Sequence, residues 1–152
     1  MIALTEGITE TNLAQLYADP LIARIGDDDQ PAAPVSHPLL KYLSAWVHGQ
    51  FVGAYIVIEF TAREYEIHSL LMRKATRHSR ELGRLVLSWA FDHESVMRVT
   101  GYIREGINSA VNHCMKMGFT YEGFRRSALM VNGEPRGIHV LGMTREDWSK
   151  TA

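Results

Sequence analysis

A strand pattern, a helix pattern and a second strand pattern follow one another in the middle of the chain, and this passage constrains the fold most. Residues 64–72 alternate between two faces with a period of two, as a strand does. A helix pattern begins at Ser79, and residues 96–103 return to strand character. Because a helical crossover joins neighbouring parallel strands, we expect these two strands to lie side by side and parallel.

Antiparallel hairpins are predicted on both sides of this passage. Before it, residues 42–47 and 51–60 read as strands joined by the turn His48-Gly49-Gln50. After it, residues 119–131 and 136–143 flank Asn132-Gly133, which is among the strongest short hairpin signals.

Two further helices are predicted outside the passage. Thr11 can cap a first helix, which ends at Asp19-Pro20 before a shorter apolar turn at residues 21–25. Residues 108–117 form a later helix that stops at Gly118, where a residue with positive φ is expected. The predicted order is therefore α, β, β, β, α, β, α, β, β.

Residues 26–38 read as a surface loop, because Asp27, Asp28 and Asp29 repel one another and the prolines block both helix and interior strand. The loop lies too near the start to divide two domains. A chain of 152 residues suits one domain, which we expect to span residues 1–152.

Composition argues against several classes of partner. Sixteen Lys and Arg against seventeen Asp and Glu leave a formal charge of −1, without the basic footprint that nucleic acid requires. The single Cys114 forbids an internal disulfide and favours a reducing compartment, and the seven histidines show no metal-ligand spacing. A basic, apolar leader and a run of ~20 apolar residues are both absent from the sequence. We expect a soluble, cytoplasmic protein that binds no metal, nucleic acid or membrane.

Residues between the predicted helices and strands resemble those of the GNAT superfamily of N-acyltransferases. Residues 116–125, Lys-Met-Gly-Phe-Thr-Tyr-Glu-Gly-Phe-Arg, look like its helix–Gly–Phe–strand passage, in the form common to the ribosomal-protein-alanine acetyltransferase subgroup. Residues 142–148 are similar to that subgroup's ending. The resemblance covers residues 39–148 well and implies a GNAT-like α/β (α+β) fold: a mixed, mostly antiparallel sheet of about six or seven strands with helices on both faces.

The resemblance also implies that acetyl-CoA is the co-substrate and binds at the turn before Ser79. Family members carry glycines there, because free amides at a helix N-terminus hold the pyrophosphate and glycine lets it come close. This chain keeps only Gly83, with His78 in place of the usual Arg or Gln and Glu81 in place of the central glycine. Nearby arginines would offset the Glu81 charge. The alternative is that the turn is only the basic, solvated start of an ordinary helix.

Residues assigned to the cofactor by this resemblance come from the turn, the preceding strand and the next helix. They are Leu70, Leu71, Met72, Arg77, His78, Ser79, Arg80, Leu82, Gly83, Arg84 and Asn108. In the family, the strand at residues 64–72 bulges and splays from its parallel neighbour, and the amides of the cofactor arm pair with the opened edge as an added strand would.

Two family positions in the later helix are altered. The family Asn that bonds pantetheine corresponds to Ile107, so Asn108 either fills that role from a shifted helix start or is only a helix N-cap. The tyrosine that protonates the leaving thiolate in many members corresponds to Cys114, which is either that acid or a small buried hydrophobe. His113 is expected to point elsewhere on the helix.

Glu66 and His68 are the candidate general bases, since an attacking amine must be neutral and a base must take its proton. They lie on one face of a strand, two residues apart, and histidine titrates near neutrality. The alternative is that they are bonded to each other or to water.

Tyr121, Arg125 and Arg126 are candidate substrate-binding residues on the strand where the family's acceptor groove begins. A pair of arginines can orient a carboxylate of the acceptor. The alternative is a solvated edge strand.

The leading hypothesis is an N-acetyltransferase that transfers the acetyl group of acetyl-CoA to a primary amine by direct attack, the acceptor being a protein N-terminus, a side chain or a small amine. The alternative is a catalytically inactive GNAT-fold protein acting as a phage or bacterial assembly or interaction factor, which the altered cofactor turn favours. A third possibility is a binder of another acyl-CoA or of a nucleotide. The closing hairpin is compatible with a homodimer.

Overall fold

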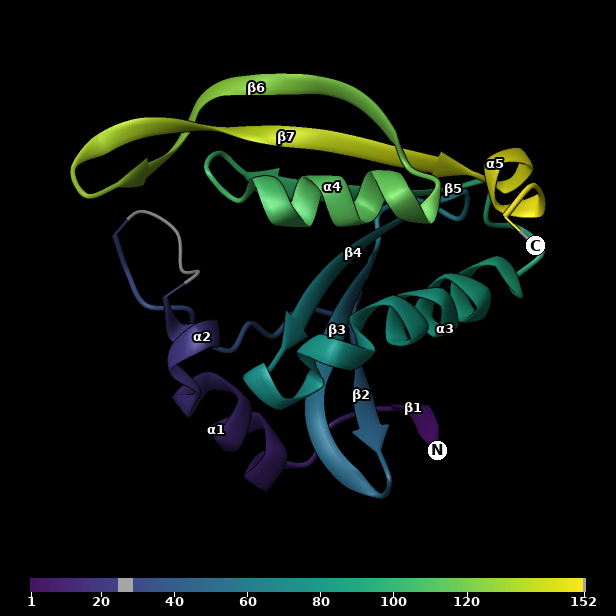
Figure 1. Ribbon diagram of the computed structural model, residues 1–152, viewed down its shortest axis with the longest axis horizontal. Helices are drawn as coiled ribbons and strands as arrows, with labels where there is room; N and C mark the ends of the chain where they lie inside the picture. The colour runs from purple at the N-terminus through teal and green to yellow at the C-terminus, as the bar shows by residue number, and fades with distance from the viewer. Residues whose placement is uncertain (25–28, 152) are drawn as a thin grey trace.

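The computed structural model describes residues 1–24 and 29–151 (Figure 1). Its strands are β1 (Ile2–Glu6), β2 (Leu40–Val47), β3 (Gln50–Glu59), β4 (Glu64–Leu71), β5 (Arg98–Arg104), β6 (Thr120–Val131) and β7 (Glu134–Thr144). Its helices are α1 (Glu10–Ala18), α2 (Pro20–Ala23), the 3-10 helix η1 (Arg73–His78), α3 (Ser79–Phe91), α4 (Asn108–Met117) and α5 (Arg145–Ser149).

The strands form one seven-stranded sheet in the order β1-β2-β3-β4-β5-β7-β6. All neighbours are antiparallel except β4 and β5, which are parallel, as the strand–helix–strand passage predicts. In Figure 1 the β6–β7 hairpin lies across the top of the molecule while β2, β3 and β4 extend below it, so the sheet changes direction at the junction of β4 and β5. The predicted fold class is confirmed.

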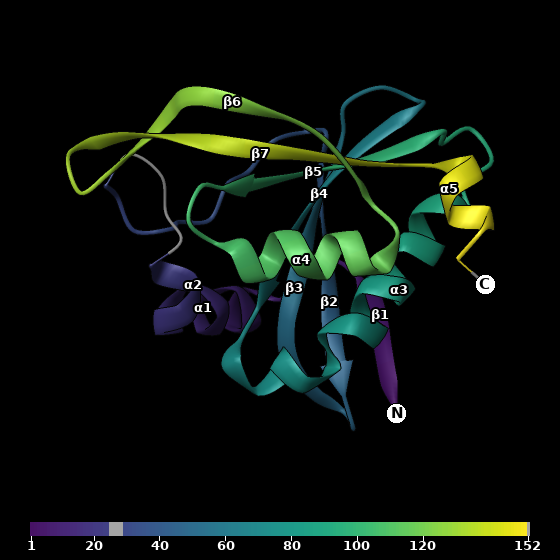
Figure 2. The ribbon, with the colours of Figure 1, turned by 45° about the horizontal axis from the view of Figure 1, so that its top comes forward.

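Helices cover both faces of the sheet, α3 and α4 on one and α1 and α2 on the other (Figure 2), and each face has its own core. On one face Leu82 and Val86 of α3 pack in a large buried cluster with Tyr65 of β4. On the other face Leu16 of α1 packs in a smaller cluster with Ile56 of β3. Side chains of β4 alternate between these two clusters, which is the basis of the site described below.

Three elements were not expected from the sequence: β1, η1 and α5. The five-residue β1 gains its order from pairing with β2. The N-cap assigned to Thr11 is wrong, because α1 begins two residues earlier and the Thr9 hydroxyl accepts the Asn12 N–H at 3.1 Å. A Thr-x-x-Asp capping box at Thr144 and Asp147 opens α5, and this signal was present in the sequence.

The predicted surface loop is described in part. Residues 29–39 form neither helix nor strand, whereas Gly26, Asp27 and Asp28 lie outside the described residues, as does Ile25 at the end of the predicted short turn. Gly118 ends α4 with φ of 112°, as expected. No helix in the described part of the chain is both long and apolar enough to cross a membrane.

Candidate functional site

β4 and β5 pair only over the first part of their length. The parallel register covers Glu64–Glu66 of β4, ending at the pair Glu66–Thr100. Beyond it β4 continues to Leu71 and β5 continues to Arg104, each still paired with its outer neighbour. The facing edges of the two strands are therefore open beyond Glu66.

Backbone direction decides which residues of β4 can use this open edge. The expected bulge is absent from the β3–β4 pairing, whose register is unbroken. The Met72 N–H donates to the Val52 carbonyl at 3.0 Å, so it is not available to a ligand. Because successive N–H groups of a strand point to opposite sides, Leu71 and Ser69 direct theirs to the open edge and Leu70 directs its own to β3.

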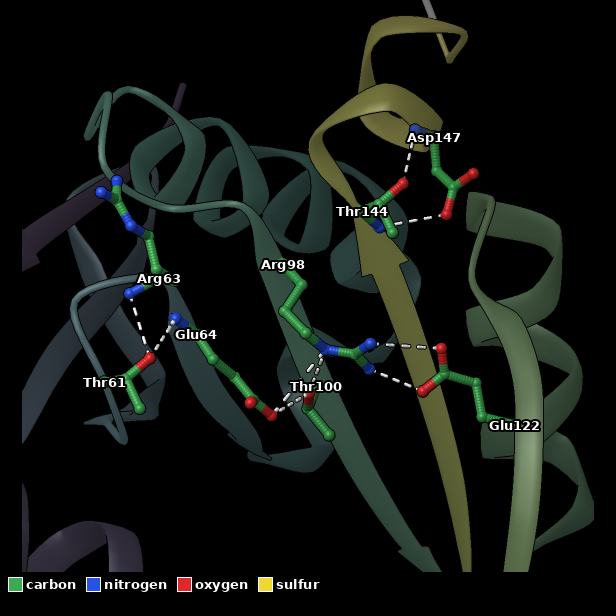
Figure 3. Close-up of polar contacts among 8 residues, drawn as sticks. All are labelled: Thr61, Arg63, Glu64, Arg98, Thr100, Glu122, Thr144 and Asp147. Atoms are coloured by element: carbon green, nitrogen blue, oxygen red, sulfur yellow. Dashed lines mark hydrogen bonds and ion pairs between the residues drawn. The ribbon is translucent and has the colours of Figure 1, made fainter.

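Side chains tie the strands together where the opening begins (Figure 3). Arg98 donates to Glu122 with two nitrogens, at 2.6 and 3.3 Å, and its Nε donates to the Thr100 hydroxyl at 3.0 Å. Thr100 in turn donates to Glu64 at 2.6 Å. A Cβ at Gly142 would overlap the Arg98 guanidinium, so glycine lets this ion pair pass over β7. The hydrogen bond to Glu122 raises the pKa of Arg98, and the cluster clamps β4, β5 and β6 at the closed end.

A cavity of about 680 Å³ occupies the opening and is lined from both faces of the sheet. This volume lies within the range of roughly 300–1,000 Å³ typical of small-molecule sites. The wall on the α3 and α4 side includes Ser79, Gly83, Val86, Leu87, Ala110, His113, Cys114 and Met117. The wall on the α1 and α2 side includes Tyr17, Ala32, Ala33, Val35, Leu40, Ile56, Ile58, His68 and Leu70.

The N-terminus of α3 meets the first wall. No side chain caps this helix, and the positive end of its dipole favours an anion there. Ser79 lines the cavity, but its N–H already donates to the Thr76 carbonyl because η1 runs directly into α3. Glu81 is exposed and does not line the cavity, so its carboxylate does not block the site as the sequence suggested.

Gly83 lets α3 and α4 approach each other. A Cβ at this position would lie 2.7 Å from Cε and 2.9 Å from Sδ of Met117. Its neighbours turn away from the cavity: Leu82 is fully buried in the core, and Arg84 donates to the Thr151 carbonyl at 2.9 Å. Arg84 also lies 5.5 Å from the centre of the Trp148 ring, toward the C-terminus. The side chains of Leu82 and Arg84 are therefore occupied elsewhere.

The remaining basic residues of the turn surround the start of α3 without entering the cavity. Arg77 and Arg80 are exposed and His78 is half-buried, and none of the three lines the cavity wall. Arg77 and Arg80 place positive charge beside the start of α3.

Helix α4 contributes two adjacent side chains to the cavity. Cys114 lines it, and burial raises the pKa of this thiol to about 11, which keeps it protonated at neutral pH. His113 lines it too, contrary to expectation, with Nε2 4.0 Å from the position of a Cβ on Gly83. Burial, and then the charges of Arg80 and Lys116, lower the pKa of His113.

Asn108 was expected either to contact the cofactor arm or to cap α4. It is exposed, it is the first residue inside α4, and it does not line the cavity. Ile107 occupies the N-cap position, so the N-cap interpretation of Asn108 is wrong. A cofactor role for Asn108 stays a prediction.

Glu66 and His68 are bonded to each other, with His68 Nε2 2.5 Å from Glu66 Oε2. Only His68 lines the cavity. A carboxylate beside Nε2 favours the tautomer with the proton on that nitrogen, which leaves the lone pair on Nδ1. The pair thus has the arrangement of a base oriented by a carboxylate.

The three candidate acceptor residues on β6 are exposed and do not line the cavity. Tyr121 bonds His139 Nδ1 through its hydroxyl at 2.8 Å. Arg125 lies 5.8 Å from the centre of the Tyr102 ring, and Tyr102 is part of the cavity wall. Arg125 is thereby brought to the rim, whereas Tyr121 and Arg126 lie apart from the cavity.

Tyr55 is a polar residue of the cavity that sequence reasoning missed. It lies on β3 opposite Ser69 and bonds this serine, and burial raises its pKa above the ordinary value. Its strand is strongly apolar, and no motif marks this tyrosine. In the described part of the chain no group of three or more His, Cys, Asp and Glu is placed to hold a metal ion.

Solved structures of N-acetyltransferases resemble this chain over almost its whole length. Spermidine N-acetyltransferase from Vibrio cholerae, in complex with CoA and spermine, gives a TM-score of 0.83 at 13% identity over 97% of this chain and 98% of that chain. A chain provisionally named an acetyltransferase gives 0.83 at 17% identity over 99% and 86%. A provisional phosphinothricin N-acetyltransferase gives 0.76 at 12% identity over 95% and 98%. At these identities the likeness shows the fold: this is a protein with the GNAT acyl-CoA N-acyltransferase fold.

The sequence also matches a family profile. Residues 26–152 match the family described as "Protein of unknown function (DUF2824)", and the chain belongs to this family. No curated protein matches. The family description names no activity, so any function has to be argued from the site.

Proposed function

We propose that this protein transfers the acetyl group of acetyl-CoA to a primary amine, as a single domain over residues 1–152. The observation that carries this proposal is the opening between β4 and β5. Its cavity reaches the uncapped start of α3 on one side of the sheet and His68 on the other. The Vibrio cholerae neighbour was crystallised with CoA, which supports a CoA-based co-substrate here.

The residues present fit the two polar parts of such a co-substrate. Ser69 and Leu71 offer open-edge amides that an arm carrying its own amides can pair with. Exposed Arg77 and Arg80, together with the helix dipole, favour a diphosphate beside the start of α3. Gly83 lies in the wall formed by α3 and α4. Glycine is needed there because a Cβ would overlap Met117, and not because the backbone has a positive φ.

In the proposed reaction the amine nitrogen attacks the thioester carbonyl carbon. The new C–N bond forms, the C–S bond breaks, and its electron pair leaves with sulfur. His68 Nδ1 takes the proton that the nitrogen loses, Glu66 stabilises the resulting imidazolium, and the proton then passes to the sulfur of the released CoA. Cys114 is a protonated thiol in the cavity wall and is the candidate to relay this proton to the sulfur.

Binding is tested first, by thermal unfolding with acetyl-CoA. A ligand at 100 times its Kd raises the free energy of unfolding by about 2.7 kcal/mol. For a protein of this size, each kcal/mol raises Tm by about 2–4 °C. We therefore expect a rise in Tm of roughly 5–10 °C. Absence of any shift at millimolar acetyl-CoA would contradict the proposal.

Catalysis is tested by release of free thiol in the presence of an amine. Loss of a general base costs typically about 10²–10⁴-fold in rate, so His68→Gln should lower kcat by that order without removing the acetyl-CoA shift. His48→Gln, in the exposed β2–β3 turn, is the matched control and should retain activity. Equal activity of both variants would remove His68 from the mechanism.

The alternative, a GNAT-fold phage or bacterial assembly factor without catalysis, is supported by three departures from the expected cofactor residues. The Ser79 N–H is already bonded, Arg84 points to the C-terminus, and Asn108 lies outside the cavity wall. The acetyl-CoA titration separates the two functions. The likeness to the ribosomal-protein-alanine subgroup remains a proposal drawn from residues 116–125 and 142–148 alone.

A further inference from the structure

We propose that the acceptor is a small primary amine carried on an apolar, uncharged body, rather than a polyamine or a polypeptide. The inference rests on the proposed function, because it names the substrate class of the same site. Three features of the cavity support it: the residues of its second wall, the absence of carboxylates from the part of that wall that the structure describes, and the loop that bounds it.

The position of His68 identifies the acceptor end of the cavity. Side chains of β4 alternate, so Ile67, Ser69 and Leu71 face α3 and α4 while His68 and Leu70 face α1 and α2. The proposed diphosphate site is at the start of α3, on the first of these sides. The amine must reach His68, and therefore approaches from the α1 and α2 side.

Apolar side chains form most of the wall on that side. They are Tyr17, Ala32, Val35, Leu40, Ile56 and Ile58. They come from α1, β2, β3 and the loop after α2, so the apolar character does not depend on one element. A wall of this kind binds a hydrocarbon or aromatic body by removing its apolar surface from water.

The described lining of the cavity gives a polycation no partner of opposite charge. Among the described residues that line the cavity there is no Asp or Glu. The nearest carboxylate on β4, Glu66, is already bonded to His68. Each further ammonium of a polyamine would lose its hydration without a partner, which opposes binding. For the single reacting amine the same apolar wall favours the neutral form, which is the nucleophile.

The loop at residues 29–39 bounds the acceptor end and argues against an extended polypeptide. Asp29 accepts the N–H groups of Asn132 and Gly133 at the β6–β7 turn. The Ala32 N–H donates to the Ala23 carbonyl at the end of α2, at 3.0 Å. Figure 1 shows residues 29–39 running from beside the tip of the β6–β7 hairpin back past α2 toward β2. A peptide lying across the sheet would have to displace these contacts, whereas a small amine would not.

Acceptor binding is measured first without acetyl-CoA, so that it is independent of the proposed activity. The probes are 2-phenylethylamine, spermidine and a hexapeptide with a free N-terminus, each added to the full chain in a thermal-unfolding assay. We expect 2-phenylethylamine to raise Tm and the other two to leave it unchanged. A shift with spermidine or with the peptide and none with 2-phenylethylamine overturns the inference, as does no shift with any probe.

Turnover is measured next, as thiol release from acetyl-CoA. We expect kcat/KM for 2-phenylethylamine to exceed that for spermidine by at least about 100-fold, the factor that corresponds to 2.7 kcal/mol. A protein that binds 2-phenylethylamine but not acetyl-CoA would refute the proposed function alone. A protein that binds acetyl-CoA and prefers spermidine would refute this inference alone.

A substitution in the cavity wall tests whether the lack of a carboxylate there determines the choice of acceptor. Val35 is exposed on the loop and lines the cavity, so Val35→Asp adds a carboxylate without disturbing the core. It should lower the selectivity ratio at least tenfold toward spermidine, whereas the uncharged Val35→Asn should not move it toward spermidine. Ser36→Asp adds the same charge one residue away, outside the cavity wall, and should keep the wild-type ratio. An equal change in Val35→Asp and Ser36→Asp would mean that the charge acts from a distance and that this wall does not select the acceptor.

Discussion

Gly53 of β3 supports the strand that bears the open edge, and its replacement by alanine tests that role. A Cβ at Gly53 would lie 2.6 Å from the Leu70 carbonyl oxygen and 2.8 Å from the Leu71 Cα. Both atoms belong to the backbone, so no side-chain rotation can relieve the overlap. Gly53 also has φ of 148°, a conformation that residues with a side chain rarely adopt.

The cost of Gly53→Ala has two parts. Residues held in a disfavoured backbone conformation cost about 1–3 kcal/mol, and overpacking costs typically about 1–3 kcal/mol. We expect a loss of roughly 2–6 kcal/mol in the free energy of unfolding, and a fall in Tm of roughly 4–24 °C. The fall is measured by circular dichroism on heating, and the free energy of unfolding by urea titration.

Gly101→Ala on β5 is the matched control. A Cβ there would meet nothing within 4 Å, and the residue does not have a positive φ. Such a change stabilises by about 0.4–1 kcal/mol, mainly through the unfolded chain. A loss below about 1 kcal/mol in Gly53→Ala, or an equal loss in both variants, would refute the reasoning about the β3–β4 contact.

Three further predictions concern groups around the site. Alkylation of Cys114 by iodoacetamide in the folded protein should rise with a midpoint near pH 11, as its raised pKa requires, and a midpoint near pH 8.5 would show an exposed thiol. Asp147 has a pKa lowered by hydrogen bonds from the Thr144 backbone and hydroxyl, so its contribution is present above the ordinary carboxyl pKa and is lost as pH falls through the folded value. The difference in Tm between the wild type and Asp147→Asn should therefore shrink below about pH 4, and a constant difference would contradict this. Arg98→Gln should lower the free energy of unfolding by about 1–2 kcal/mol, and a double-mutant cycle with Glu122→Gln should show coupling, whereas additive losses would mean that the ion pair does not stabilise the closed end.

Much of the sheet could be predicted because its signals are local. The Asn132-Gly133 turn fixes the last hairpin, and Gly118 ends α4 with the positive φ that its position suggests. The strand–helix–strand passage fixes the parallel pair of β4 and β5, because a helical crossover returns the chain to the same edge of the sheet. These features depend on residues within a few positions of one another, so one sequence is enough to find them.

The site could be predicted only in outline, because its side chains meet through the fold. Sequence spacing placed Glu66 and His68 on one face, which the structure confirms, but it could not show that only His68 reaches the cavity. Arg84 looked like part of the cofactor turn, and the fold draws it to Trp148 and Thr151 at the other end of the chain. A single sequence carries no local signal for contacts between residues so far apart in the chain.

The most direct test of the central claim is amide hydrogen exchange of β4 with and without CoA, resolved by NMR. If the open edge between β4 and β5 receives the arm of the co-substrate, CoA will slow exchange at Ser69 and Leu71 and leave Met72, already bonded to Val52, nearly unchanged. Unchanged exchange at Ser69 and Leu71 under millimolar CoA would contradict the account.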